Sequence, residues 1–460
     1  MTFEITSTEF HLQREKESGT LMAVLSEIHE YILDLIENKL SPGAKLPGAR
    51  SIAEHFSCSL PRVQTVLDLL EQSGVVESRP RSGTYVSADC KERLLLRNVV
   101  CSKFSNALTD EQRRWFRKSF PELHLTGAFH RGGVEILSSF TALTRRHHYQ
   151  DLSEIFQECF PDGKKRFFTE SLSPFYIEGK LFAIPVMFSP QILWYNPELF
   201  SQAGVSMPEN DWGKDDFLAA LRQLHKRFSG RRIINFSPHF QQWSRFVHGA
   251  GALFFDPALP EPVQVDSPKT LEVCLKYLEL LRELDLAVDY DPDPIKSFAE
   301  GKLALFSGFR QSAYYFREHG IDFTPGAVLM PDLGSGEKQL GAALIGFRNN
   351  FYGREKIKEL LQFWLSDSIQ ETLGISNYGV PFLRSAARKT LDPSKAPDCF
   401  LLDRIPALNA HCQIPSEELG EILMRSSFLI NSSTPEQLPH ILKELATTMR
   451  FIVKLRSQSI

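Results

Sequence analysis

Three short apolar stripes followed by a basic hairpin occupy the first 90 residues, and this order limits the fold more than any other feature of the sequence. Residues 21–40 carry leucine and isoleucine at spacings of three and four, which is typical of an amphipathic helix. A second helix is predicted at 49–56 and a third after Ser59, which can serve as its N-cap. Two short strands then enclose a basic turn at 79–83. Three helices and a hairpin predict a winged helix-turn-helix.

The same segment resembles the GntR family of bacterial transcription regulators. The resemblance rests on four stretches that occur in the family's order: 40–50 (LSPGAKLPGAR), 52–59 (IAEHFSCS), 67–74 (LDLLEQSG) and 79–86 (RPRSGTYV). It implies that residues 18–88 form a DNA-binding domain.

The local charge agrees with a DNA-binding face. From residue 39 to 81 there are six basic and four acidic residues, an excess of two positive charges in a chain whose net charge is −4. A short basic face is sufficient for phosphate contacts. The resemblance implies that Arg50 contacts the phosphate backbone, that the third helix enters the major groove, and that the wing reaches the minor groove. The predicted DNA-binding residues are Lys45, Arg50, Ser59, Leu60, Arg62, Gln64, Arg79, Arg81 and Gly83.

The start of the third helix departs from the family pattern. Family members usually have arginine straight after the helix-start serine and again four residues later, where this chain has Leu60 and Gln64, and Arg62 replaces the usual threonine. Arginine binds guanine with two hydrogen bonds, whereas glutamine prefers adenine. We therefore expect an operator that differs from the family's common one. For each arginine, an ordinary solvated surface charge is the alternative.

The rest of the chain alternates strand-like and helix-like segments. At 460 residues the chain is about three times a typical domain of roughly 150 residues, so we expect a multidomain protein. The charged segment 89–120 is predicted to be a partly helical linker, and residues 121–460 an α/β effector domain. The strand-like runs are 181–188, 302–306 and 343–347, and the helical stretches are 216–228, 270–284 and 355–365.

Catalytic and cofactor motifs are missing from the sequence. The enzyme alternative, a fusion to an aminotransferase-like domain, would need a Ser-x-x-Lys-type segment for pyridoxal phosphate, and none is found. Phosphate-binding loops, HExxH, GxSxG and GxGxxG motifs are missing as well. Seven cysteines without C-x-x-C spacing do not indicate a zinc site. We therefore expect no enzyme activity, no cofactor and no metal.

A second resemblance runs from about residue 122 to 390. Six stretches look like the extracellular solute-binding proteins of sugar ABC transporters. These are 175–185 (FYIEGKLFAIP), 193–205 (LWYNPELFSQAGV), 211–217 (DWGKDDF), 249–256 (GAGALFFD), 297–306 (SFAEGKLALF) and 370–381 (QETLGISNYGVP). The resemblance implies a type 2 periplasmic-binding-protein fold, in which two α/β lobes joined by crossing strands close around a ligand. The predicted architecture is thus an N-terminal α+β winged helix and a C-terminal two-lobed α/β domain.

Ligand recognition in such a cleft would use aromatic faces and a few polar groups. Packing in the core is the favoured alternative for Trp194, whereas ligand contact and packing are equally open for Trp243 and Tyr378. Arg310 could pair with a ligand carboxylate or with an internal acid. The candidate ligand-binding residues are Gln191, Trp194, Trp243, Phe309, Arg310, Asn377 and Tyr378.

Together these features predict a transcription regulator that is controlled by a small molecule, expected to be a sugar or oligosaccharide. Its partner would be double-stranded operator DNA, bound by a homodimer because palindromic operators require paired heads. The alternative is a C-terminal domain that serves only dimerisation or protein docking. No apolar run approaches the roughly 20 residues that cross a bilayer, and no secretory signal is recognisable, so we expect no membrane contact and a cytoplasmic location.

Overall fold

The computed structural model describes residues 24–25, 27–29, 31–36, 39–72, 74–90, 98–101, 107–120, 123–126, 132–236, 240–257, 259–286, 291–336, 340–349, 351, 353–376, 379–408, 414 and 416–457. Its contacts divide the chain into two compact units. The first unit comprises Met1–Asn106, Asp110–Glu135 and Phe347–Gly353, and the second comprises Ala107–Thr109, Ile136–Gly346 and Arg354–Ile460.

The first unit begins with a helical head and a two-stranded wing. The described residues between 24 and 36 are helical, and helices α2 (Ala49–His55) and α3 (Leu60–Gln72) follow. Strands β1 (Val76–Arg79) and β2 (Gly83–Val86) pair antiparallel with each other. The predicted winged helix-turn-helix is therefore confirmed.

The apolar stripes of the head meet in one core, which is why their spacing predicted the helices. Tyr31 stacks on His55 with 4.8 Å between ring centroids, so the first helix also contacts α2 at the edge of the core. Gly74 has a φ of +73°, a conformation that glycine adopts without strain, and it turns the chain from α3 toward β1. The core side chains include Ile28, Ile32, Ile36, Ile52, Val63, Val66, Leu70, Val75 and Val86.

The segment 89–120 contains a strand and a helix. Strand β3 (Asn98–Val100) pairs in parallel with β4 (His124–Thr126) and with β5 (Val134–Ser138). Helix α5 (Asp110–Ser119) exposes most of its charged side chains, which explains why the composition suggested a linker. Besides this helix, the segment supplies a strand with two hydrogen-bonded neighbours.

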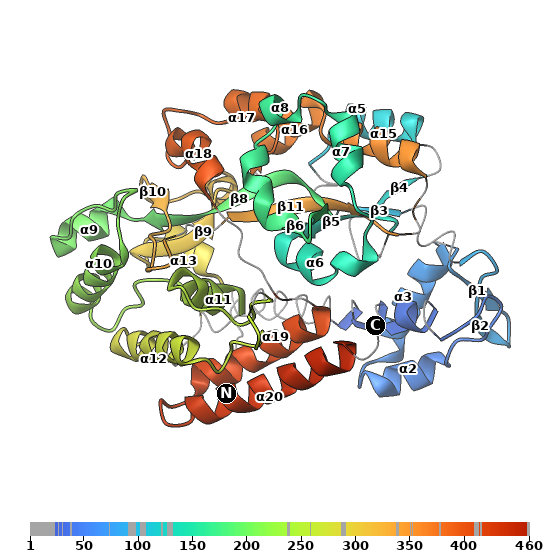
Figure 1. Ribbon diagram of the computed structural model, residues 1–460, viewed down its shortest axis with the longest axis horizontal. Coiled ribbons are helices and arrows are strands. Elements are labelled where there is room, and N and C mark those ends of the chain that lie inside the picture. The colour runs from blue at the N-terminus through green and yellow to red at the C-terminus, as the bar shows by residue number, and fades with distance from the viewer. Residues whose placement is uncertain are drawn as a thin grey trace, which may run out of the picture. The chain divides into compact units, whose positions relative to one another are not determined.

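A long strand, β8 (Ile184–Tyr195), organises the second unit. Its first half pairs antiparallel with β11 (Leu340–Phe347) and β12 (Val380–Pro381). Its second half pairs antiparallel with β9 (Leu305–Phe309) and β10 (Gly326–Leu329). Figure 1 shows β8 running from the strand group that contains β11 to the group that contains β9 and β10. The order in the mixed sheet is β10-β8-β11-β5-β3-β4, with β9 and β12 also paired to β8.

The change of partners along β8 falls between two neighbouring residues. Pro190 faces Leu340 of β11, and Gln191 faces Phe309 of β9. Proline has no N–H group to donate to a sheet, so it is tolerated where one ladder of hydrogen bonds ends and another begins. The sequence predicted one strand at 181–188, whereas the structure divides this run between β7 (Lys180–Leu181) and β8, which continues through Pro190 to Tyr195.

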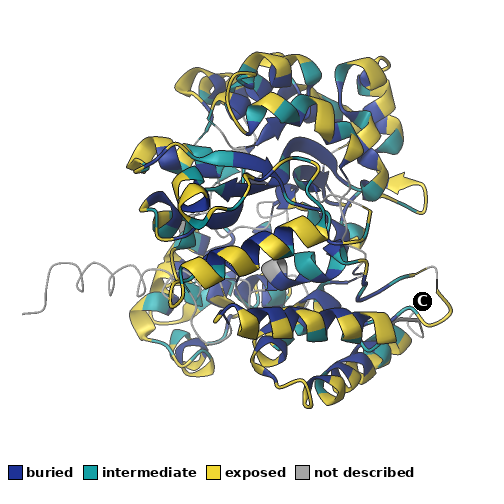
Figure 2. Ribbon diagram, turned by 90° about the vertical axis from the view of Figure 1, so that its left-hand side faces the viewer, coloured by how far each residue is buried: buried dark blue, intermediate teal, exposed yellow. Residues whose placement is uncertain are grey.

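Helices surround these strands, and Figure 2 shows many of them with one buried and one exposed side. The helices predicted at 216–228, 270–284 and 355–365 are confirmed as α10 (Lys214–Arg227), α12 (Pro268–Glu283) and α15 (Arg354–Trp364). None of the helices formed by the described residues is long and apolar enough to span a membrane. The remaining elements are α6 (Ser139–Thr144), η2 (Arg146–His148), α7 (Ser153–Cys159), α8 (Gly163–Arg166), η3 (Thr169–Phe175), β6 (Tyr176–Ile177), β7 (Lys180–Leu181), α9 (Pro197–Ala203), α10 (Lys214–Arg227), α11 (Phe240–Gly249), α12 (Pro268–Glu283), α13 (Pro294–Ala299), α14 (Ser312–His319), α15 (Arg354–Trp364), α16 (Asp367–Ile375), α17 (Arg384–Thr390), α18 (Asp398–Arg404), η4 (Ile405–Ala407), α19 (Glu417–Ser432) and α20 (Leu438–Ser457).

The close approach of β10 to β8 yields a stability prediction. A Cβ atom added to Gly326 would lie 2.0 Å from the ring of Tyr195, so Gly326→Ala must displace the ring or the strand. We expect the variant to lower the free energy of unfolding by about 1–3 kcal/mol, the usual cost of overpacking, in urea denaturation followed by circular dichroism. The control is Gly353→Ala, whose Cβ meets nothing within 4 Å. Equal stability of the two variants would contradict the packing described here.

Candidate functional site

The head carries its predicted DNA-contacting residues on its surface. Arg62 is partly buried beside the core, and the other eight residues are exposed. Leu60, a large apolar side chain at the first position of α3, is 42% exposed, which is unusual for leucine. This placement is compatible with DNA contact, and the roles of the individual residues stay predictions.

The wing brings together basic residues from two distant parts of the sequence. Lys45 forms an isolated antiparallel bridge with Tyr85, and the guanidinium of Arg79 lies 4.2 Å from the centre of the Tyr85 ring. A Cβ atom on Gly83, whose φ is +111°, would lie 2.9 Å from the Lys45 side chain. Arg81 is exposed in the turn and also has a positive φ, +62°. The wing therefore combines the cations of Lys45, Arg79 and Arg81.

The exposed side of α3 carries the residues that depart from the family pattern. The Gln64 amide donates a hydrogen bond of 2.8 Å to the carboxylate of Asp68, one turn later. Val63 is fully buried in the head core, so Gln64 faces outward. To reach a base edge, the Gln64 amide would exchange its bond to Asp68 for bonds to the base.

A second candidate site lies where β8, β9 and β11 meet. Five residues there are partly exposed and lie close together, and we call them the crossing-strand cluster: Ser189, Arg245, Phe309, Gln311 and Gly341. The Gln311 amide donates to the Ser189 hydroxyl at 2.6 Å. A Cβ atom on Gly341 would lie 3.1 Å from the Ser189 carbonyl oxygen and 4.0 Å from the Phe309 ring.

Arg245 supplies the positive charge of this cluster from helix α11. Its guanidinium carbon lies 4.7 Å from the centre of the Phe309 ring, within range of a cation–π interaction. Burial lowers the pKa of Arg245 to about 10, so the side chain still carries its charge at neutral pH. The cluster thus combines an aromatic ring, a cation, an amide and a hydroxyl, the groups that recognise polar small molecules.

Two of the predicted ligand contacts are engaged inside the protein. The Gln191 amide donates to the Ser307 hydroxyl at 2.9 Å, and both side chains are buried. The Trp194 indole N–H donates to the Phe309 carbonyl at 3.1 Å, while its ring packs edge-on against Phe316. This arrangement favours packing over ligand contact for Trp194, and it occupies the Gln191 amide.

Trp243 also packs in the core. Its ring makes edge contacts with Phe240 and Phe254, at 5.8 and 5.0 Å between centroids, and the side chain is 1% exposed. Its indole N–H has no hydrogen-bond partner among the described residues. Of the two alternatives that the sequence left open for Trp243, the structure favours packing.

Arg310 is held by internal partners. Its guanidinium forms a two-bond ion pair with Asp398, at 2.7 and 2.8 Å. It also donates to the carbonyl oxygens of Gly374 and Gly379, at 3.2 and 3.0 Å, and of Thr390 at 3.5 Å. The side chain is 2% exposed. The internal acid is therefore the observed partner of Arg310.

The predicted contacts Asn377 and Tyr378 lie outside the described residues. Phe309 is thus the predicted residue that reaches the crossing-strand cluster.

Sequence reasoning missed Ser189, Arg245 and Gln311. Arg245 follows Trp243 by two positions on α11, so the two side chains project about 200° apart. If Trp243 is assigned to the core, Arg245 must therefore lie on another side of the helix, and this spacing could have identified it from the sequence.

A surface groove of about 440 Å³ lies elsewhere in the second unit, between α10, α11 and α12. Leu218, Phe246 and Leu280 are among its apolar lining residues. Its rim is charged, but Arg222 pairs with Glu283 at 2.6 Å and Lys276 lies 2.5 Å from Glu272. None of the predicted ligand contacts lines this groove. Among the described residues, no group of three His, Cys, Asp or Glu could hold a metal ion.

Family models match two parts of the chain. Residues 26–86 match the bacterial regulatory proteins of the gntR family, and residues 137–399 match the bacterial extracellular solute-binding proteins. The second match covers more than half of the chain, so the chain belongs to the bacterial extracellular solute-binding protein family. A GntR-type winged helix is joined to its N-terminal side. Both resemblances identified in the sequence are confirmed.

Solved structures confirm the two-lobed α/β fold. An ABC substrate-binding protein from Listeria monocytogenes in complex with cycloalternan is 15% identical, with a TM-score of 0.61, and the match covers 77% of this chain and 98% of that one. Maltose-bound MalE3 from T. maritima is 15% identical (TM-score 0.59; 78% and 100% covered). UgpB from Mycobacterium tuberculosis in complex with glycerophosphocholine is 15% identical (TM-score 0.59; 79% and 99% covered). No curated protein sequence matches the chain significantly.

The Arg310 network predicts a large loss of stability when the cation is removed. Arg310→Met leaves the Asp398 carboxylate without its main partner, and breaking a buried ion pair in this way typically costs about 3–5 kcal/mol. We expect a loss of this size in the urea unfolding free energy. Arg317→Met is the matched control, because Arg317 pairs with Glu318 on the surface and such pairs contribute about 0–1 kcal/mol. Similar losses for both variants would refute a special role for Arg310.

Proposed function

We propose that this protein is a DNA-binding transcription regulator whose solute-binding domain senses a sugar or oligosaccharide. The observation that carries the proposal is the fusion of a GntR-type head to a solute-binding fold that spans 98–100% of the length of the proteins named above. A binding domain that shares a chain with a DNA-binding head can change DNA affinity in response to its ligand. We propose no enzymatic reaction, and a cytoplasmic location follows from the need to reach DNA.

We propose the crossing-strand cluster as the ligand site. Phe309 offers an aromatic face to sugar C–H groups, while Ser189, Gln311 and Arg245 offer a hydroxyl, an amide and a cation to sugar hydroxyls. Cycloalternan and maltose, bound by two of the similar proteins, are sugars, which supports this ligand class. The position on β8 also supports it, because a ligand at the exchange of strand partners can contact both strand groups.

In the mechanism we propose, ligand binding favours a closed arrangement of the two strand groups, and that change alters how paired heads fit an operator. By linkage, DNA and ligand must then change each other's affinity by the same factor. The same linkage holds for a repressor and for an activator. We assign the head to residues 18–88 and the sensor to residues 121–460 together with β3.

The alternative is that the C-terminal domain serves only dimerisation or protein docking. The specific observation in its favour is that Trp194, Trp243 and Arg310 are engaged internally, so these side chains do not offer a sugar-binding surface. Under this alternative the fold is retained as a scaffold, and no sugar stabilises the protein.

A ligand screen separates the two functions. We expect at least one mono- or oligosaccharide to raise the thermal unfolding temperature, because a ligand that binds only the folded state stabilises it by about 2.7 kcal/mol at 100 times its Kd. Phe309→Ala and Arg245→Gln should abolish the shift, whereas Leu259→Ala, which truncates an exposed loop side chain, should retain it. The same ligand should change affinity for the protein's own upstream DNA. The docking alternative prevails if no sugar gives a shift while DNA binding is intact.

The DNA-binding surface makes a separate prediction. Arg50→Ala and Arg81→Ala should each weaken operator binding and reduce the slope of log affinity against log salt by about 1, because each removes a phosphate contact. Gln64→Arg should move base preference from adenine toward guanine. These effects can be measured by fluorescence anisotropy at several salt concentrations, with Arg317→Ala as a surface control. Salt slopes identical to wild type in both arginine variants would show that neither side chain contacts phosphate.

A further inference from the structure

The groove between α10, α11 and α12 has no role in the functions proposed above. Its volume of about 440 Å³ lies within the range of small-molecule sites, about 300–1,000 Å³. None of the described residues that line it belongs to the crossing-strand cluster. All of its charged lining residues come from two helices, α10 and α12. The groove is therefore a candidate for a second ligand site in this chain.

Apolar side chains form the floor of the groove. Val273, Leu280 and Leu333 are buried in the hydrophobic core of the second unit. Leu218 and Phe246 are partly exposed and pack against that core. A ligand that covers these two side chains removes apolar surface from water, which is favourable. The floor thus favours an occupant with an apolar body.

One end of the groove carries an excess of positive charge. Lys214 begins α10, and Lys269 is the second residue of α12. The pKa of Glu272 is lowered, first by its hydrogen bond with Lys276. The charges of Lys269 and Lys214 lower it further, so both lysines lie near the same carboxylate. Within the described part of the chain, Glu272 pairs with Lys276, whereas Lys214 and Lys269 form no ion pair. Three lysines and one glutamate leave this end with two positive charges.

Acidic residues close to this end in the sequence do not line the groove. Asp215 and Asp216 follow Lys214, but successive residues of a helix project about 100° apart, so they lie on other sides of α10. Asp216 also accepts a hydrogen bond of 3.0 Å from the backbone N–H of the residue that caps α10. Asp332 accepts hydrogen bonds from the backbone N–H groups of residues 334–336. The two lysines therefore remain available to an anion in the groove.

The opposite end of the groove has the opposite charge. Arg222, two turns after the start of α10, donates two hydrogen bonds to the Glu283 carboxylate, at 2.6 and 3.0 Å. Glu279 lies one turn before Glu283 on α12, is exposed, and forms no ion pair with a described residue. Two glutamates and one arginine leave this end with one negative charge. The groove is thus apolar in its middle, positive at one end and negative at the other.

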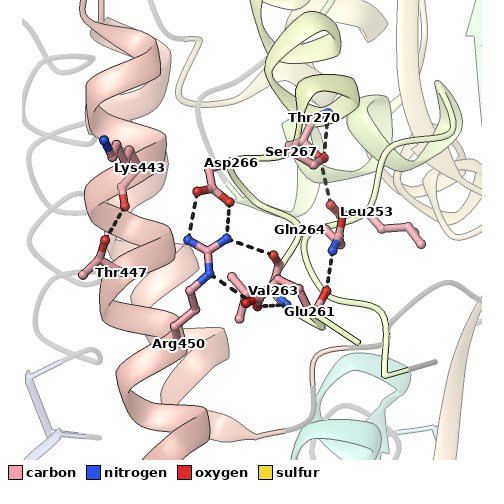
Figure 3. Close-up of polar contacts among 10 residues, drawn as sticks. All are labelled: Leu253, Glu261, Val263, Gln264, Asp266, Ser267, Thr270, Lys443, Thr447 and Arg450. Carbon is pink, nitrogen blue, oxygen red and sulfur yellow. Dashed lines mark hydrogen bonds and ion pairs between the residues drawn. The ribbon is translucent and has the colours of Figure 1, made fainter. Parts of the chain in front are cut away.

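The start of α12, which carries one of the two free lysines, is held in place. Arg450 of α20 forms a two-bond ion pair with Asp266, at 2.9 and 2.7 Å. The Ser267 hydroxyl accepts a hydrogen bond of 3.2 Å from the backbone N–H of Thr270. Figure 3 shows both contacts at the start of this helix. Because Lys269 lies between Ser267 and Thr270, its backbone is fixed before a ligand binds, which reduces the entropy lost on binding.

We propose that this groove binds an amphipathic carboxylate with one apolar chain, the chemistry of a medium-chain fatty acid. The carboxylate pairs with Lys214 and Lys269 at the positive end. The chain lies over Leu218 and Phe246 and points toward the negative end, where Glu279 repels a second anionic group. The site goes beyond the regulatory function proposed above and does not depend on it, since no residue is shared with the crossing-strand cluster.

Isothermal titration calorimetry of the full-length protein with hexanoate, octanoate and decanoate, below micelle-forming concentrations, tests the site. We expect each added CH2 group to tighten binding by about two- to fourfold, because the chain is buried on an apolar floor. Decanedioate and decylamine should bind more weakly than decanoate, because the first places a carboxylate near Glu279 and the second places a cation near the lysines.

Variants locate the binding in the groove. Lys214→Gln and Lys269→Gln should each weaken decanoate binding by about two- to fivefold, the range expected for a partly exposed ion pair. Leu218→Trp, which places a large side chain in the groove, should abolish it. Lys165→Gln is the matched control, because Lys165 is an exposed lysine of α8 that does not line the groove.

Circular dichroism verifies that each variant folds, and if Leu218→Trp does not, the lysine variants carry the test. No binding of any of the three carboxylates, or equal affinity for all three, would overturn the proposal. So would decylamine that binds as tightly as decanoate, or a Lys214→Gln/Lys269→Gln double variant that binds decanoate like Lys165→Gln.

Discussion

The hydrogen bonding of β8 is the constraint on which the second unit depends. One strand of 12 residues is paired to β11 and β12 through its first half and to β9 and β10 through its second half. Any motion of one strand group relative to the other must therefore bend this strand near Pro190, where the ladders exchange. The crossing-strand cluster lies beside that point, so a ligand bound at the proposed site would act where β8 changes its pairing partners.

Arg310 has a comparable role for the positions next to it. It lies between Phe309 and Gln311, and its own side chain points into a buried network with Asp398 and three carbonyl groups. A buried cation with this many partners cannot shift without losing several hydrogen bonds at once. The network therefore holds its two neighbours in place, and a site whose groups are fixed in advance binds with a smaller loss of entropy.

The head could be predicted almost to the residue because its helices and hairpin are specified by local spacing and turn residues. The proposed ligand site could not, because the direction of a tryptophan is decided by residues far away in the chain. Trp194 reaches the Phe309 carbonyl, and Trp243 packs on Phe254. Likewise, the partner of Arg310 is Asp398, and nothing in the sequence spacing brings the two together. Strand β3 was missed for another reason, since its three residues are too few to establish a period.

The position of β3 has a consequence for how the molecule can be divided. This strand lies between β4 and β5 and is hydrogen-bonded to both. A fragment that begins at residue 121 would keep those two strands and lose the one that joins them, leaving two edges with unpaired backbone groups that are prone to associate with other chains. A gene fragment intended to produce the sensor alone, or to graft it onto another DNA-binding head, should therefore begin upstream of Asn98.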